Sequence, residues 1–327
     1  MSFKFPAPIG GTPFTFDFAP SVVFTVAWAL LVPLVAWRII SPKSRTCVSA
    51  NPMALVLERL IILSLRSSEA HMNTGHISHN LNIFIQTTYS LGFVNLTSGI
   101  LGLLRNLLVS ATLSSVSDNV TAGPIAKDDS ESTIAPESTS TIEAGIAERA
   151  GERMWYRRIT NSLIVAFLLP LSLGIAAGVV FPKAERNVHM VDTERSLRYI
   201  TGAISYLLLL LVQGLTLYAA VAVRGIARTP VWTLFILLSL LNIVAIYRLV
   251  VMRSMTDSAT SLAAGSLNTR TSKILFYVLH LVPEWLVAAF LLGVNAREFY
   301  RAGLWGDQIK PLEKGLVPAK TEAETSR

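Results

Sequence analysis

Polar side chains that interrupt long apolar runs are the residues of this chain whose types could do chemistry. Carboxylate, guanidinium, imidazole and amide groups are costly in hydrocarbon, so a membrane segment that keeps one has a functional or a structural reason for it. Seven such groups are candidate substrate-binding residues: Glu58, Asn95, Gln213, Asn242, Arg248, His280 and Glu284. None of them is predicted to be catalytic.

The depth of these groups suggests a shared site. With a rise of about 1.5 Å per residue from the ends of the apolar runs, five groups fall near mid-depth, while Arg248 and His280 lie closer to the outer side. The five are Glu58, Asn95, Gln213, Asn242 and Glu284. A partly hydrated cavity at this level could bind a cationic headgroup or shuttle protons through the two carboxylates, with Arg59 or Arg248 as counter-charge.

A structural explanation competes with this functional one. Polar groups inside a membrane also tie helices together, through hydrogen bonds worth about 0.6 kcal/mol each. The structural explanation is favoured for Asn95 and Asn242. The functional one is favoured for Glu284, because the neighbouring Pro283 frees a backbone carbonyl one turn earlier in the same run.

The histidines allow a further hypothesis, a zinc-dependent membrane lipid hydrolase. Such a site needs three protein ligands around an open position, together with an acid or base such as Glu284. The candidate ligands are His71, His76, His79 and His280. Because His71 and His76 do not share a helical face and no intramembrane aspartate accompanies them, this hypothesis is the least favoured. No metal and no cofactor is predicted, and a protein without enzymatic activity is favoured.

The elements that must position these groups are membrane-spanning helices. The chain is 52% hydrophobic and only 15% charged, with a mean hydropathy of +0.51, which is far too apolar for a soluble domain. Six runs reach the roughly 20 residues that cross a bilayer: 22–40, 83–104, 163–181, 200–223, 231–252 and 274–294. A seventh, 48–65, is shorter and contains Glu58 and Arg59, so it could instead be interfacial or re-entrant. The predicted fold is an all-α, polytopic bundle of seven transmembrane helices.

The basic residues predict the orientation of this bundle. The net charge is +7, but Lys and Arg flank the apolar runs, so the charge indicates topology and no nucleic-acid partner is expected. With seven spans and an outer N-terminus, 17 basic residues are cytosolic and nine are outside. The N-terminus is therefore predicted outside and the C-terminus in the cytosol. The single cysteine, Cys47, excludes an intrachain disulfide.

The spans divide the chain into five regions. Residues 1–20 are predicted to be an extracellular segment, 21–110 to hold helices one to three, and 159–294 to hold helices four to seven. Residues 111–158, rich in Ser, Thr and acidic side chains, are predicted to be a disordered cytosolic loop that could bind a cytosolic partner. Residues 295–327 are a cytosolic tail that begins with a short amphipathic segment.

Several short motifs give the chain a resemblance to a known family. They are Glu58 with Arg66, the segment 86–105 with Tyr89, the sequence GAISYLLLLLVQG at 202–214, Tyr247-Arg248, and Phe276-Tyr277 leading to Pro283. In these features the chain resembles the fungal RTA-like proteins, seven-helix lipid-translocating exporters. It departs from them where Glu-x-x-Gly-Tyr reads Glu-Arg-Leu-Ile-Ile, where no acidic residue follows Arg248, and where His280 replaces an aspartate. The resemblance implies seven helices and a lipid substrate.

The favoured hypothesis is thus an integral protein of the plasma membrane or an endomembrane that binds or translocates an amphipathic lipid through a polar cavity, with membrane lipids as its partners. A seven-helix, receptor-like signalling protein is the alternative. The zinc-dependent lipid hydrolase is the second alternative.

Overall fold

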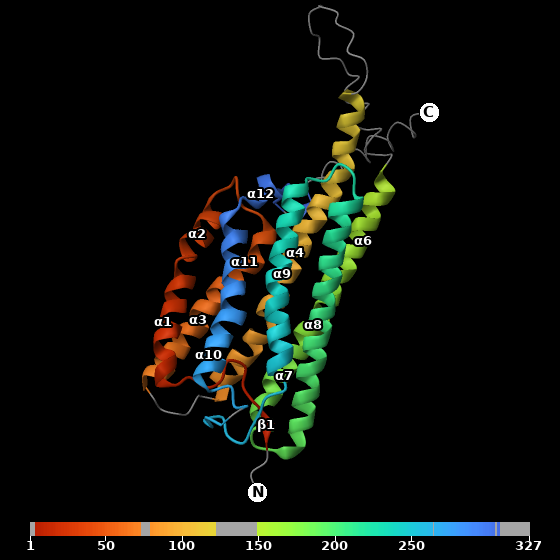
Figure 1. Cartoon of the computed structure of the whole chain (residues 1–327). Helices are drawn as coiled ribbons and strands as arrows, with labels where there is room; N and C mark the ends of the chain where they lie inside the picture. The colour runs from red at the N-terminus through yellow and green to blue at the C-terminus, as the bar shows by residue number, and fades with distance from the viewer. Residues whose placement is uncertain (1–3, 73–78, 122–148, 264, 305, 308–327) are drawn as a thin grey trace, which may run out of the picture.

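The computed structural model describes residues 4–72, 79–121, 149–263, 265–304 and 306–307, and the regular structure of these residues is almost entirely helical. Seven helical segments are long and apolar enough to cross a membrane. They run side by side as one elongated bundle (Figure 1). The predicted all-α seven-helix fold is confirmed, and the chain is a polytopic integral membrane protein. We call the end that carries the N-terminal segment the outer end and the opposite one the inner end, after the predicted orientation.

Three of the seven spans are built from more than one helix. A 3₁₀ turn at Thr15–Asp17 leads into the first span, which consists of α1 (Phe18–Ala29) and α2 (Val32–Ile40). The fourth consists of α6 (Ala150–Ala166) and α7 (Leu168–Ala184). The seventh consists of α10 (Arg270–Phe276), a π-helical turn (Tyr277–Leu281) and α11 (Val282–Gly293). Proline lies just after each break, at 33, 170 and 283, where it cannot supply the N–H that a continuous helix needs.

The remaining elements are single helices and short strands. The other spans are α3 (Ala50–Met72), α4 (His79–Thr121), α8 (Val188–Ala222) and α9 (Arg228–Val251). At the outer end β1 (Phe5–Pro6) pairs antiparallel with β2 (Met255–Thr256), with Phe5 opposite Thr256. At the inner end α12 (Ala296–Phe299) is followed by the antiparallel pair β3 (Ala302–Gly303) and β4 (Gly306–Asp307).

The doubtful second span crosses the whole bundle. Its helical segment, Cys47–Met72, is 26 residues long because it continues about two turns beyond the apolar run 48–65. Arg59 is fully buried, whereas Leu57 and Ile61 on the opposite face are about half exposed to the lipid side. The charge therefore points into the bundle, which removes the reason to expect an interfacial segment.

The central helix of the bundle is α4. It packs against α3, α6, α7, α8, α9 and α11, and 78% of its most apolar window is buried, compared with 22% for the first span. Two glycines of α7 make one of these contacts close. A Cβ atom at Gly174 would lie 2.8 Å from Leu91, and one at Gly178 would lie 3.1 Å from the Cβ of Thr87. The Gly-x-x-x-Gly spacing thus lets α7 approach α4.

The helices extend into the predicted disordered loop, 111–158. Residues 111–121 continue α4, and residues 150–158 begin α6. The reason is that the first turns of α6 bury Arg153 and Tyr156, and Arg153 donates a hydrogen bond to Thr112 on α4 over 3.5 Å. The boundaries predicted for the loop are therefore wrong at both ends, and residues 122–148 lie outside the described part of the chain.

The N-terminal segment differs from the expected extracellular arm. Residues 5–13 are buried in the outer mouth of the bundle, and the first span begins within the predicted segment 1–20. At the inner end a side chain of α2 joins this helix to α11. Arg38 donates to the backbone oxygens of Leu292 and Gly293 at the end of α11, each over 2.8 Å.

Candidate functional site

A buried ion pair between α3 and α11 is the centre of the polar core. Arg59 Nε lies 2.9 Å from Glu284 Oε2, and Nη2 lies 3.1 Å from Oε1, so the two planar groups face each other in a bidentate pair. Both side chains are fully buried. Gly92 of α4 lies against this pair, and a Cβ atom there would be 2.7 Å from Glu284 Oε1. The glycine is the reason that the central helix can pass the pair so closely.

Glu58 and His280 extend this pair into a cluster. Arg59 Nη1 lies 3.3 Å from Glu58 Oε1, and the Glu58 side chain is 23% exposed. His280 Nε2 lies 3.8 Å from Glu284 Oε1, beyond hydrogen-bond distance, and neither ring nitrogen of His280 makes a hydrogen bond. We call these four residues the ion-pair cluster. Glu58 is its one carboxylate with access to the surroundings.

Aromatic rings separate His280 from water. The ring of Phe276 stacks on it with 5.4 Å between centroids, and the rings of Tyr89 and Tyr247 lie 5.8 Å and 6.0 Å away. The π-helical turn Tyr277–Leu281 carries this histidine, and such turns are common at functional sites.

Arg248 of α9 is buried without a carboxylate. Its Nη1 donates to the backbone oxygen of Ser90 on α4 over 2.5 Å, and its guanidinium lies 5.1 Å from the centre of the Phe93 ring. Within the described ranges no acidic oxygen lies within ion-pair distance of it, and its Nε makes no hydrogen bond. It is thus a buried cation that contacts a backbone carbonyl and an aromatic ring instead of a carboxylate.

The amides predicted at mid-depth lie elsewhere. Asn242 of α9 donates to Gln213 Oε1 of α8 over 2.5 Å, and Gln213 donates to Ser239 over 3.1 Å. These bonds tie α8 to α9. Asn95 is partly buried, and its backbone oxygen accepts from Asn51 over 3.1 Å. The structure therefore brings Glu58, His280 and Glu284 together around Arg59, and leaves Asn95, Gln213 and Asn242 outside this cluster. A role for any of them in substrate binding stays a prediction.

A second charged cluster, which the sequence did not predict, lies at the outer end. Asp17 is fully buried, pairs with Arg66, and lies 3.2 Å from Lys273 Nζ. The Tyr277 hydroxyl donates to Asp17 Oδ1 over 2.9 Å and lies 2.8 Å from the Ser21 hydroxyl. The signal available in the sequence was an aspartate just before the first apolar run and a lysine just before the last one. We call Asp17, Arg66 and Lys273 the outer cluster.

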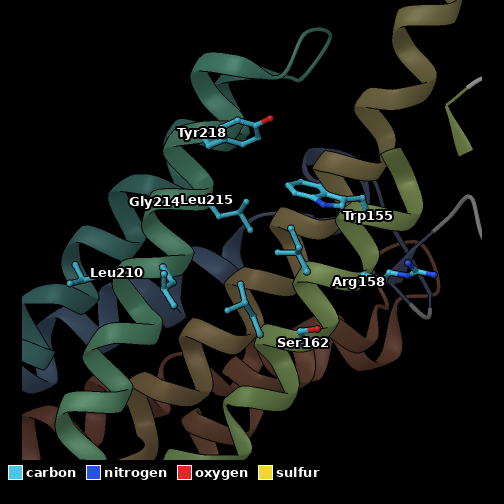
Figure 2. A pocket seen from close by; sticks show the side chains of 10 residues that line it. Trp155, Arg158, Ser162, Leu210, Gly214, Leu215 and Tyr218 are labelled. Atoms are coloured by element: carbon cyan, nitrogen blue, oxygen red, sulfur yellow. The ribbon is translucent and has the colours of Figure 1, made fainter. Parts of the chain in front are cut away.

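A groove opens on the lipid-facing side between α6 and α8. Its volume is about 690 Å³, and its lining consists of Trp155, Arg158, Ile159, Ser162, Leu163, Leu210, Leu211, Gly214, Leu215 and Tyr218. It arises because α6 packs on α4 while α7 packs on α8, and because Gly214 has no side chain to fill the space. Figure 2 shows the Trp155 indole and Leu215 pointing toward one another across it.

The groove continues toward the inner end. A second hollow of about 410 Å³ shares Trp155 and Tyr218 with it and adds Gly151, Glu152 and Tyr156. Its rim is charged, since Arg149 and Glu152 form an ion pair of 3.7 Å there. The result is an apolar surface groove of ligand-pocket size with aromatic and charged groups at its inner end.

Metal ligands are not grouped in the described part of the chain. No set of three His, Cys, Asp or Glu side chains there could hold a metal ion. His71 is exposed and packs against Phe18, with 5.4 Å between ring centroids, whereas His280 is enclosed in the core. His76 and the side chain of His79 lie outside the described residues.

The comparisons with known proteins assign no family to the chain, so its fold defines its class. No family model, no curated protein and no solved structure matches the chain. Fold and site define a seven-helix integral membrane protein with a buried ion-pair cluster and a lipid-facing groove.

Proposed function

We propose that this protein binds an amphipathic membrane lipid in the groove between α6 and α8, with the acyl chain along the leucines and the headgroup at the inner rim. The groove is the observation that carries this proposal. It opens to the side of the bundle, where lipid tails are the surrounding solvent, and its volume is typical of small-molecule sites.

The rim indicates the class of headgroup. Arg158 is among the residues that line the groove, with its guanidinium pointing away from it in Figure 2. The Tyr218 hydroxyl and the Trp155 indole can donate hydrogen bonds at the depth where such rings meet headgroups. The inner end also carries most of the basic residues, which attract anionic lipids of the cytosolic leaflet. A phosphate-bearing lipid therefore fits the rim better than a cationic one.

The ion-pair cluster is poorly suited to bind a cationic headgroup. Both oxygens of Glu284 already accept from Arg59, so a cation would have to displace a buried arginine. Glu58 is the carboxylate that such a ligand could reach. The resemblance to the RTA-like exporters supports a lipid as the substrate. Because those proteins are lipid-translocating exporters, the proposal includes movement of the lipid across the membrane.

Photocrosslinking tests the proposal. The protein is reconstituted with a phosphatidylglycerol that carries a diazirine in its acyl chain, and crosslinks are mapped by mass spectrometry. We expect them at 155–163 and 210–218. Gly214→Trp adds an indole at a position where no atom lies within 4 Å of a Cβ and that lines the groove, so it should reduce these crosslinks at least five-fold.

The matched control is Ile236→Trp, a lipid-facing position on α9 that is 59% exposed and outside the groove. It should leave the crosslinks unchanged. Equal crosslinking in both variants would contradict binding in the groove. A lipid-flip assay in liposomes then separates binding from translocation, since Gly214→Trp should slow flipping only if the groove is on the path.

A receptor-like protein is the second candidate, and one observation favours it. Residues 5–13 are buried in the outer mouth, and side chains of the spans hold them through their backbone, which is also how a peptide is bound. Such a protein would recruit a cytosolic partner when the mouth is liganded, and deletion of residues 122–148 should abolish that recruitment. A pull-down in which the deletion changes nothing contradicts this candidate.

A further inference from the structure

The outer mouth of the bundle is filled by nine residues of the chain itself. Residues 5–13 form one continuous buried stretch between exposed Lys4 and the first helix. β1 in this stretch pairs with β2, and the N–H of Ala7 continues the pairing by donating to Ser254 over 3.0 Å. In Figure 1 the stretch begins with β1 and runs across the outer end of the bundle toward α1. We call residues 5–13 the mouth segment.

Side chains from four spans hold this segment through its backbone. Arg198 of α8 donates to the oxygen of Ala7 over 2.8 Å, and Gln86 of α4 accepts from the N–H of Ile9 over 2.9 Å. Arg66 of α3 donates to the oxygens of Gly10 and Gly11. Backbone recognition of this kind is how an extended peptide is bound in trans.

The last span and the loop before it complete the set. Lys273 donates to the oxygens of Gly10 and Thr12 over 2.8 Å and 2.6 Å. Asn268 accepts from the N–H of Thr12 over 2.8 Å. The mouth thus carries donors and acceptors that are spaced for a peptide main chain.

Two glycines give the site its sequence preference. Gly10 and Gly11 have φ of +75° and +61°, which L side chains rarely adopt. A Cβ at Gly10 would lie 2.8 Å from the Phe276 ring, and one at Gly11 would lie 2.6 Å from the backbone oxygen of Leu267. Only a peptide with a Gly-Gly pair at this point fits.

The cations of the mouth keep carboxylate partners when the segment is absent. Asp17 lies outside the mouth segment and pairs with both Arg66 and Lys273. Likewise Glu194 pairs with Arg198 on the same helix. The cations that hold the segment therefore retain carboxylate partners without it, so its departure leaves no buried cation unpaired.

We propose that the outer mouth is a binding site for a peptide that turns at a Gly-Gly pair, and that the mouth segment is its tethered, exchangeable ligand. The function is separate from lipid binding in the groove, because the mouth lies at the opposite end of the bundle.

A synthetic peptide of residues 4–13 is the probe, with a fluorophore on Lys4, which is exposed in the chain. The acceptor is the full chain with Gly10→Val and Gly11→Val, which expels its own segment and keeps every residue of the mouth. In nanodiscs we expect this variant to bind the peptide at least ten-fold more tightly than the parent chain. The same peptide with both valines should not bind.

A disulfide supplies the matched control. With Cys47→Ser, the pair Ala7→Cys and Ser254→Cys locks the segment in place, and this chain should bind no peptide until it is reduced. The chain without residues 2–13 is a second acceptor. If either acceptor is recovered only when peptide is added during reconstitution, that rescue also supports the proposal.

The proposal is wrong if neither acceptor binds or is rescued by the peptide, or if the locked chain binds as well as the acceptors. Crosslinking of lipid in the groove is measured separately on the same variants, so a failure here leaves the lipid result readable.

Discussion

Arg59 is the residue on which the ion-pair cluster depends, since it contacts both carboxylates and is itself fully buried. Removal of one partner from a buried pair costs about 3 to 5 kcal/mol, mainly because the other charge remains unpaired, whereas replacement of both by apolar groups is often neutral. We therefore expect Arg59→Met and Glu284→Leu each to lower the free energy of unfolding by that amount, and the double variant to recover most of it. Unfolding in mixed detergent micelles measures this cycle.

Glu58→Gln is the control for the cycle. Its side chain is partly exposed and makes one contact of 3.3 Å with Arg59, so the change should cost less than about 1 kcal/mol. If the two single variants add up in the double variant, the pair does not act as a unit. The same cycle bears on function, because a Glu284→Gln variant that loses lipid transport could do so through this loss of stability alone.

The sequence predicted part of this site at the level of single residues. Polar groups within apolar runs can be found by inspection, which is how Glu58, His280 and Glu284 were found. Their partners could not be assigned, because nothing in a run says which neighbour it faces. Asp17 and Lys273 were missed for a related reason. Each lies at the edge of an apolar run, where a charge needs no explanation, and their contact joins positions 256 residues apart.

At the scale of elements, the contact between α4 and α7 rests on small residues. Gly178 lies against Thr87 so closely that an added methyl group would meet the Cβ and Cα of that residue at 3.1 Å and 3.3 Å. Gly178→Ala should therefore lower the free energy of unfolding by about 1 to 3 kcal/mol, the usual cost of overpacking. The measurement is the same detergent titration.

Gly214→Ala on α8 is its matched control, since no atom lies within 4 Å of a Cβ there. It should be neutral or slightly stabilising, because alanine is the better helix former. A similar loss at both glycines would show that helix propensity and packing are not separable here. It would also remove the explanation for the close approach of α7 to α4.

The positions of the helices were predicted better than the contacts between them. Each of the seven predicted runs matches a helical segment: four lie inside it, and the runs 200–223, 231–252 and 274–294 end one residue beyond it. The agreement is close because a stretch of about 20 apolar residues forms a spanning helix in a membrane. The predicted inner ends of α4 and α6 were wrong, because contacts such as that of Arg153 with Thr112 extend both helices past the apolar region. The groove could not be predicted either. Periodicity identifies a lipid-facing side chain such as Leu211, but it does not say where α6 and α8 diverge.

At the scale of the whole molecule, the orientation of the bundle in its membrane can be measured by labelling a native cysteine. Cys47, the single cysteine, is exposed at the inner end, where it is the first residue of the second span. With 17 basic residues on the inner side against nine on the outer, the positive-inside bias places this end in the cytosol. A membrane-impermeant thiol reagent added to intact cells should therefore leave Cys47 unlabelled. Labelling should rise at least ten-fold after permeabilisation.

The outer end supplies the opposite result. Asp257 is exposed in the loop that follows β2, so Asp257→Cys in a Cys47→Ser background should be labelled equally in intact and permeabilised cells. If Cys47 is labelled in intact cells and this variant is not, the bundle is inverted. The groove rim would then face the outer leaflet and the mouth segment the cytosol, so the source of the lipid and the source of any exchanging peptide would both change sides.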